Sequence, residues 1–123
     1  MKKYKKFFEE DIWREAYELQ KEVFEISRSF PPEERYGLWN QINKSSNSVV
    51  ANRAEAHGRY YFADKVRTLY IVRCELEETQ SHLIVACSRG YVSKEACLKL
   101  VNKYENLKKK INGDIKNLNS QKK

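Results

Sequence analysis

The sequence has very few of the residues that make turns, with four Gly and two Pro among 123 residues. Antiparallel sandwiches and barrels need frequent turns, so this shortage argues against both. No apolar run approaches the roughly 20 residues that span a membrane. An acidic segment, Glu9-Glu10-Asp11, follows the basic start, where a signal peptide would have its apolar part. We therefore expect a single helical domain that is soluble and cytoplasmic.

Residues that commonly carry catalysis or bind metals are also scarce. The three cysteines form no Cys-x-x-Cys pair, which favours reduced, buried thiols over disulfides. Of the two histidines, His57 lies beside a helix end and His82 follows Glu78 by four residues, which is typical of a pair on a helix surface. The four glycines form no phosphate-binding loop. We expect no enzymatic activity, no cofactor and no metal site.

The formal net charge of +7 is unevenly distributed. The first six residues contribute four Lys, and residues 103–123 contribute seven Lys against two acidic residues. Between these basic ends, residues 7–34 hold nine acidic against three basic residues, whereas residues 35–73 hold seven basic against two acidic residues. Such segregation suits an anionic partner or a neighbouring copy of the same chain.

Apolar residues recur at spacings of three and four along four segments, which predicts four helices. The first is expected from about Phe8 to Ser29, ahead of Pro31-Pro32, and the second from Glu33 to Gly58. The third is expected from Tyr60 to Ser88, and the fourth begins after Ser93. A second apolar line on the first helix indicates that it buries two faces.

Short connections between long helices make neighbours antiparallel, so the sequence predicts an all-α, up-down-up-down four-helix bundle. The expected organisation is a basic N-terminal arm over residues 1–7, a bundle over residues 8–116, and a basic, frayed tail over residues 117–123.

A basic and aromatic segment covers the end of the second predicted helix and the first half of the third. Arg and Lys neutralise phosphates, and exposed Tyr rings such as Tyr60 and Tyr61 stack on unpaired bases. The alternative is that these residues pair with the acidic first helix, within the bundle or between subunits. The candidate nucleic-acid-binding residues are Lys44, Arg53, Arg59, Lys65, Arg67 and Arg73.

Several short motifs along the chain together resemble one known family. They are Ile12-Trp13-x-x-Ala16-x-x-Leu19, Phe30-Pro31-x-x-Glu34-x-Tyr36-Gly37-Leu38-x-x-Gln41-Ile42, Ser48-Val49-x-x-Asn52-x-Ala54-Glu55-x-x-Gly58-Arg59, Arg73-x-x-Leu76-x-Glu78-Thr79-Gln80 and Gly90-Tyr91. Their joint spacing, over about residues 8–115, is similar to that of the four-helix bundle proteins also known as 23S ribosomal RNA intervening-sequence proteins. Two positions depart from the family motif: Arg53 replaces an apolar residue, and Ala56 replaces a glycine.

The resemblance implies an up-down bundle that assembles into a ring-shaped homopentamer without enzymatic activity. Some members are encoded inside ribosomal RNA genes. A related branch, the accessory variability determinant proteins of diversity-generating retroelements, binds nucleic acid and a reverse transcriptase through a basic surface.

Two functions follow as expectations. The first is a homopentamer that binds RNA or DNA, as an accessory factor to a reverse transcriptase or in ribosomal RNA metabolism. The second is a protein–protein interaction scaffold that binds no nucleic acid.

Overall fold

The computed structural model describes residues 5–121, and these form four long helices and two short 3-10 turns. The long helices are α1 (Asp11–Ser27), α2 (Leu38–Gly58), α3 (Phe62–Ser88) and α4 (Lys94–Gln121), and the 3-10 turns are η1 (Phe7–Glu9) and η2 (Pro32–Glu34). The described chain contains no strand, so the predicted all-α class with four helices is confirmed. None of the described helices is both long enough and apolar enough to cross a membrane.

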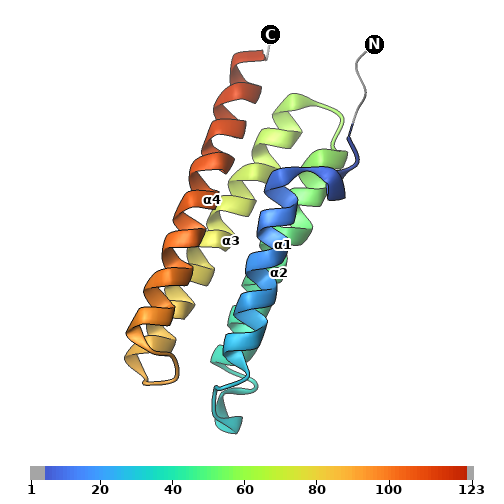
Figure 1. The fold of residues 1–123 in the computed structure, drawn as a ribbon. Helices are drawn as coiled ribbons and strands as arrows, with labels where there is room; N and C mark the ends of the chain where they lie inside the picture. The colour runs from blue at the N-terminus through green and yellow to red at the C-terminus, as the bar shows by residue number, and fades with distance from the viewer. Residues whose placement is uncertain (1–4, 122–123) are drawn as a thin grey trace.

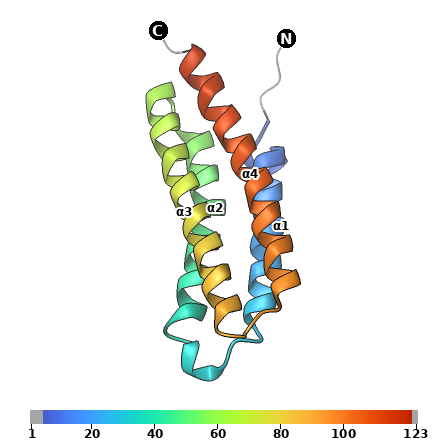
Figure 2. The ribbon, with the colours of Figure 1, turned by 90° about the vertical axis from the view of Figure 1, so that its left-hand side faces the viewer.

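The four helices lie side by side, as Figures 1 and 2 show from two directions. In the described chain α2 packs on α1 and α3, and α4 packs on α3 and α1. Both ends of the described chain lie at the same end as the α2–α3 connection, which we call the terminal end (Figure 1). The connections that contain Pro31 and Gly90 lie at the other end, which we call the proline end.

The core is built from the apolar positions that recur along each helix. Ile42, Leu76, Leu83, Leu107 and Ile111 are fully buried, as their three-and-four spacing predicts. Complete burial of each such side chain contributes about 1.5–3 kcal/mol. These positions therefore set which face of each helix turns inward.

Small polar residues occupy some of the inward-facing positions of α2. They form hydrogen bonds with residues of neighbouring helices. The hydroxyls of Ser45 and Thr79 lie 2.8 Å apart, and both residues are almost completely buried. At the proline end of α2, Asn43 donates to Ser27 Oγ at 3.1 Å. These bonds satisfy polar groups that would otherwise be costly to bury.

Several predicted helix boundaries are wrong. The first helix begins at Asp11 because Phe7–Glu9 forms η1, and the second begins at Leu38 because residues 32–34 form η2. At the other terminus α4 continues to Gln121, and thus includes residues 117–121 of the expected tail. The last turns of α4 stay helical because Ile115 and Leu118 pack against the core. Residues 1–4 of the predicted arm and residues 122–123 of the tail lie outside the described chain.

The Glu34 side chain holds the proline end together. Its Oε1 accepts from the backbone N–H of Leu38 at 3.2 Å, at the first residue of α2. Its Oε2 accepts from the hydroxyl of Tyr91 and from the guanidinium of Arg89, both at 2.8 Å. A side chain on Gly37 would place its Cβ only 3.0 Å from Glu34 Oε1, so glycine leaves room for this contact.

These hydrogen bonds, first that from Tyr91, hold the pKa of Glu34 below its ordinary value. A carboxyl with a lowered folded-state pKa stabilises the fold above its unfolded pKa, and this contribution is lost as pH falls through the folded pKa. We therefore expect Glu34→Gln to lower Tm by a few degrees at pH 7 and by less at pH 3. Thermal unfolding followed by circular dichroism measures both. The matched control is Glu33→Gln at the exposed neighbouring residue, and an equal loss of Tm at the two pH values would contradict this role.

Candidate nucleic-acid interface

The net positive charge of the described residues is concentrated in the half of the bundle nearest the terminal end. Contacts between helices give their alignment, and a level across the bundle can be drawn between the Ser45–Thr79 contact on the proline side and the Glu15–Lys110 and Arg73–Asn112 contacts on the terminal side. On the terminal side of this level lie residues 5–16, 50–74 and 109–121, which hold 11 basic against 7 acidic residues. The rest of the described chain holds 9 basic against 10 acidic residues. The described net charge is therefore +4 on one half and −1 on the other.

The remaining four lysines, Lys2, Lys3, Lys122 and Lys123, belong by sequence to the two termini and lie outside the described residues. Along the chain the basic segment of residues 53–73 is far from the Lys-rich part of α4. The structure brings them together, because Lys109, Lys110 and Lys116 lie in the same half as that segment. Local sequence patterns do not reveal this, since it depends on how the helices are aligned.

Arg53 is buried and does not belong to an exposed basic surface. Its side chain is 9% exposed, and its guanidinium lies 3.2 Å from Asp114 Oδ2 and 3.9 Å from Glu10 Oε2. Arg53 thus links α2 to α4 and to the residue before α1. This corrects its expected contact with nucleic acid, because the charge of Arg53 is already paired inside the bundle.

Lys65 also has a structural role. Its Nζ donates to the backbone carbonyls of His57, at 2.8 Å, and Ala56, at 3.2 Å, in the last turn of α2. Burial is the main reason that its pKa is lowered, and the nearby charge of Arg53 adds to the effect. Lys65 therefore stabilises the C-terminus of α2, where carbonyls lack helical partners. His57, in the same turn, hydrogen-bonds the carbonyl of Lys5 at 2.9 Å.

Three of the candidate arginines remain on the surface of the terminal half. The side chain of Arg59 is 49% exposed and pairs with Glu55, and that of Arg67 is 74% exposed and pairs with Asp64. Arg73 donates to Asn112 at 2.8 Å, and its guanidinium lies 5.0 Å from the ring centre of Tyr70. Exposed ion pairs are worth at most about 1 kcal/mol, so phosphates can compete for these arginines.

Lys44 lies apart from the other candidates, in the proline half. It lines a hollow together with Glu75, Glu78 and His82. In this hollow His82 and Glu78 form the expected pair on one helix, 3.3 Å apart. In residues 5–121 no group of three His, Cys, Asp or Glu side chains comes close enough to hold a metal ion.

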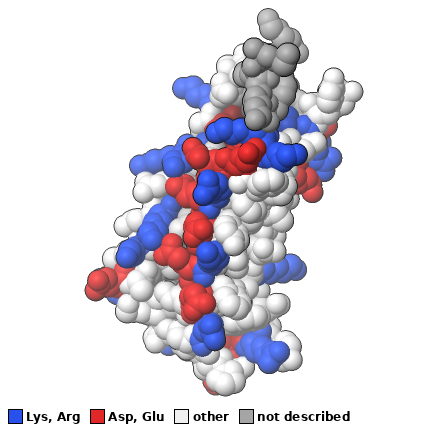
Figure 3. Space-filling view, turned by 45° about the vertical axis from the view of Figure 1, so that its right-hand side comes forward, with Lys and Arg blue, Asp and Glu red and all other residues white. Residues whose placement is uncertain are grey.

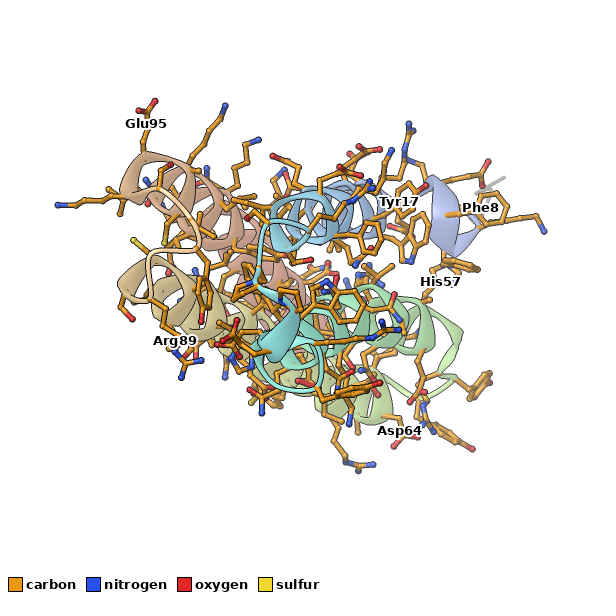
Figure 4. The ribbon with its side chains drawn as sticks, turned by 90° about the horizontal axis from the view of Figure 1, so that it is seen from below. Phe8, Tyr17, His57, Asp64, Arg89 and Glu95 are labelled. Atoms are coloured by element: carbon orange, nitrogen blue, oxygen red, sulfur yellow. The ribbon has the colours of Figure 1, made fainter. Side chains whose placement is uncertain are left out.

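Aromatic side chains surround the α2–α3 connection and the start of the described chain. Tyr60 is 84% exposed and Tyr61 67% exposed, and their rings pack edge to face with centres 4.9 Å apart. Phe7 packs against His57, and Figure 4 shows Phe8, His57 and Asp64 on the same side of the molecule. Arg89 and Glu95 lie on the opposite side of that view.

A second surface, on α1 and α2, has few charged residues, although Lys21 Nζ lies 5.2 Å from the ring centre of Tyr17. Figure 3 shows a column of alternating acidic and basic side chains beside a long area with few charges. The second apolar line on α1, expected to be buried, includes Tyr17 and Phe24, which are 42% and 43% exposed in the single chain. Trp13 stacks on Tyr17 with ring centres 5.3 Å apart. We call this surface the Trp13 face; by helical spacing it comprises Trp13, Tyr17, Gln20, Phe24, Asn43, Asn47, Ala51 and Ala54.

Arg53→Met tests the assignment of Arg53 to the bundle. Removal of one partner leaves Asp114 without its counter-charge, and we expect the free energy of unfolding to fall by about 2–3 kcal/mol at pH 7. This is below the usual loss for fully buried pairs because Asp114 and Glu10 are each about one-third exposed.

Burial raises the pKa of Asp114 above its ordinary value, against the lowering effect of Arg53. At acid pH the carboxyl becomes neutral and no longer needs the guanidinium. The difference in stability between wild type and Arg53→Met should therefore shrink from pH 7 to pH 4, as measured by urea denaturation. Adding Asp114→Asn should restore part of the stability at pH 7, and a loss that is the same at both pH values would argue against the pair.

Comparison with known proteins gives a matching family model and solved structures of similar fold. The family model described as 23S rRNA-intervening sequence protein matches residues 9–113. A crystal structure of a protein of unknown function from the S23 ribosomal protein family of Bacteroides thetaiotaomicron aligns with a TM-score of 0.78 and 23% identity. The alignment covers 85% of this chain and 98% of that chain, and it supports the fold. No curated protein matches the chain. Because the family model matches most of the length of this chain, the chain belongs to the 23S rRNA-intervening sequence protein family.

Proposed function

We propose that this protein is a non-enzymatic nucleic-acid-binding bundle that holds RNA or DNA at its terminal end. The observation that carries the proposal is the charge asymmetry, with +4 on the terminal half and −1 on the proline half of the described chain. Both ends of the described chain lie at the basic end, and each continues in sequence with two more lysines. A polyanion approaching the bundle is therefore attracted to one end.

Arg59, Arg67 and Arg73 are the residues that we assign to phosphate contacts. Arg59 and Arg67 are exposed, and Arg73 is half-buried with its guanidinium hydrogen-bonded to Asn112 at the surface. Arg53 and Lys65 support the same end from inside, so their loss would act on stability before it acts on binding. Lys44 is outside the proposed surface.

We further propose that the up-down-up-down bundle assembles into a ring-shaped homopentamer through the Trp13 face. The half-exposed aromatics and the scarcity of charge on this face are typical of surfaces that become buried between subunits. Ring closure needs a different face on the neighbouring copy, so the Trp13 face supplies one side of each contact. Five basic ends in one assembly would raise the affinity for a long nucleic acid through effective concentration.

Two cellular roles fit this activity: that of an accessory factor to a reverse transcriptase and a role in ribosomal RNA metabolism. The family description names 23S rRNA, which favours RNA as the first ligand to test. The second candidate function is a protein–protein scaffold, and the exposed Trp13 face favours it if the protein proves to be monomeric.

The binding proposal predicts a salt-dependent affinity that needs the three arginines. In fluorescence polarisation with a structured RNA and a duplex DNA, we expect the triple variant Arg59→Ala, Arg67→Ala, Arg73→Ala to bind at least tenfold more weakly near 0.1 M salt. The slope of log affinity against log salt should become shallower by roughly 0.9 for each lost phosphate contact on duplex DNA.

The control changes three exposed lysines of the proline half to alanine, namely Lys44, Lys94 and Lys99, and removes the same amount of charge. If both triple variants lose affinity equally, the attraction is due to net charge alone and the proposed surface is wrong. Wild-type protein that binds neither ligand would favour the scaffold function.

The assembly proposal predicts a mass of about 73 kDa by light scattering, five times 14.6 kDa. We expect the double variant Tyr17→Glu, Phe24→Glu to shift the mass toward that of a single chain, because buried charges oppose association. Tyr36→Glu, at an exposed aromatic of the proline end, is the control and should leave the mass unchanged. A double variant that stays fully assembled would exclude the Trp13 face from the interface.

A further inference from the structure

Tyr60 and Tyr61 have no evident role in stabilising the fold. At 84% and 67% exposure they bury little area, and within residues 5–121 neither hydroxyl forms a hydrogen bond. Because so little of their area is buried, the two side chains contribute little hydrophobic stabilisation to the fold. Their edge-to-face packing leaves at least one face of each ring open to solvent.

The backbone holds these two rings in a defined place. Arg59 and Tyr61 have extended conformations, with ψ of 141° at both residues, and they flank Tyr60 in the short link between α2 and α3. Tyr61 is the N-cap of α3, and its carbonyl accepts from the N–H of Lys65 at 3.0 Å. The Nζ of Lys65 binds the last carbonyls of α2, so one residue fixes both sides of the link. A backbone held in this way reduces the entropy that is lost on binding.

Charged groups from three elements lie around the link. Arg59 at the end of α2 pairs with Glu55, and Arg67 in α3 pairs with Asp64. From the start of the described chain, exposed Lys5 and Lys6 precede Glu9 in η1, and the Lys5 carbonyl contacts His57 in the last turn of α2. The rings are thus bordered by exposed cations.

We propose that the Tyr60–Tyr61 link binds unpaired nucleotides, so that the terminal end selects single-stranded RNA or DNA over duplex. Bases would stack on the open ring faces while Arg59 and Arg67 contact the flanking phosphates. Inside a duplex the base faces are covered by their neighbours, so only a single strand offers them to an aromatic side chain. This inference rests on the proposed function and specifies its ligand.

Tyr36 shows that exposure alone does not define the site. It is 88% exposed in the proline half, with Arg35 5.8 Å from its ring centre. It has no adjacent second tyrosine, and its half of the described chain carries no net positive charge. It therefore serves as the matched control for loss of an exposed tyrosine ring.

The test compares a labelled oligo(U) or oligo(dT) strand of about 15 nucleotides, within the range of common single-strand sites, with a duplex of equal length. In fluorescence polarisation we expect Tyr60→Ala, Tyr61→Ala to weaken single-strand binding at least tenfold and duplex binding less than twofold. Tyr60→Phe, Tyr61→Phe should bind as wild type, because stacking needs the ring and not the hydroxyl. Tyr60→Leu, Tyr61→Leu keeps apolar bulk without a ring and should behave like the alanine variant. Tyr36→Ala should have no effect.

The possible failures are separable. If wild type binds single strands and duplexes in a salt-dependent way and the alanine variant retains single-strand affinity, the stacking site is wrong and the proposed function stands. An equal loss on both ligands would also overturn the stacking site, since duplex binding does not use the ring faces. If wild type binds neither ligand, the proposed function fails and the inference fails with it.

Discussion

The Glu34 carboxylate joins parts of the chain that are far apart in sequence, namely the start of α2 and the connection between α3 and α4. Each partner occupies a position that this contact requires. Gly37 leaves space for the carboxylate, and Gly90, with a φ of 81°, allows the turn that brings Tyr91 back toward it. The residues Glu34, Gly37 and Gly90-Tyr91, which belong to the motifs noted in the sequence, thus have a structural role in closing the proline end.

The opposite end is closed by a different ionic contact. Arg53, with Asp114 and Glu10, links α2 to α4 and to the start of α1, while Lys65 stabilises the end of α2. The sequence motif led us to expect an apolar residue at position 53, and the burial of Arg53 against Asp114 and Glu10 shows how a charged residue is accommodated there. The residues available to a partner are then those left exposed around this contact, which are arginines, lysines and two tyrosines.

The helices could be predicted from the sequence because three-and-four spacing reports directly which face is buried. The residues at which the helices begin and end were harder to predict from the sequence. Glu33 and Glu34 favour a helix start, yet Glu34 acts from η2, and its distant partners Arg89 and Tyr91 decide this. The same limit applies to the site. Arg53 and Lys65 look like members of an exposed basic cluster, because the carboxylate of Asp114 lies 61 residues from Arg53 along the chain. Conversely, the lysines of α4 join the basic end only through the alignment of the helices.

The hydrogen bond between Ser45 and Thr79 bears on how that alignment is chosen. Aliphatic contacts between α2 and α3 change little if one helix slides along the other by a turn, since Leu69, Val72, Leu76 and Leu83 offer similar surfaces. The hydroxyl pair does change, because a slid helix would place each hydroxyl opposite an aliphatic side chain, at a cost of about 1 kcal/mol. The pair thus discriminates against shifted packings that would separate Arg53 from Asp114 at one end and Glu34 from Tyr91 at the other. One polar contact in the core thereby helps to fix the register of α2 against α3, and with it the pairing of residues at both ends of the bundle.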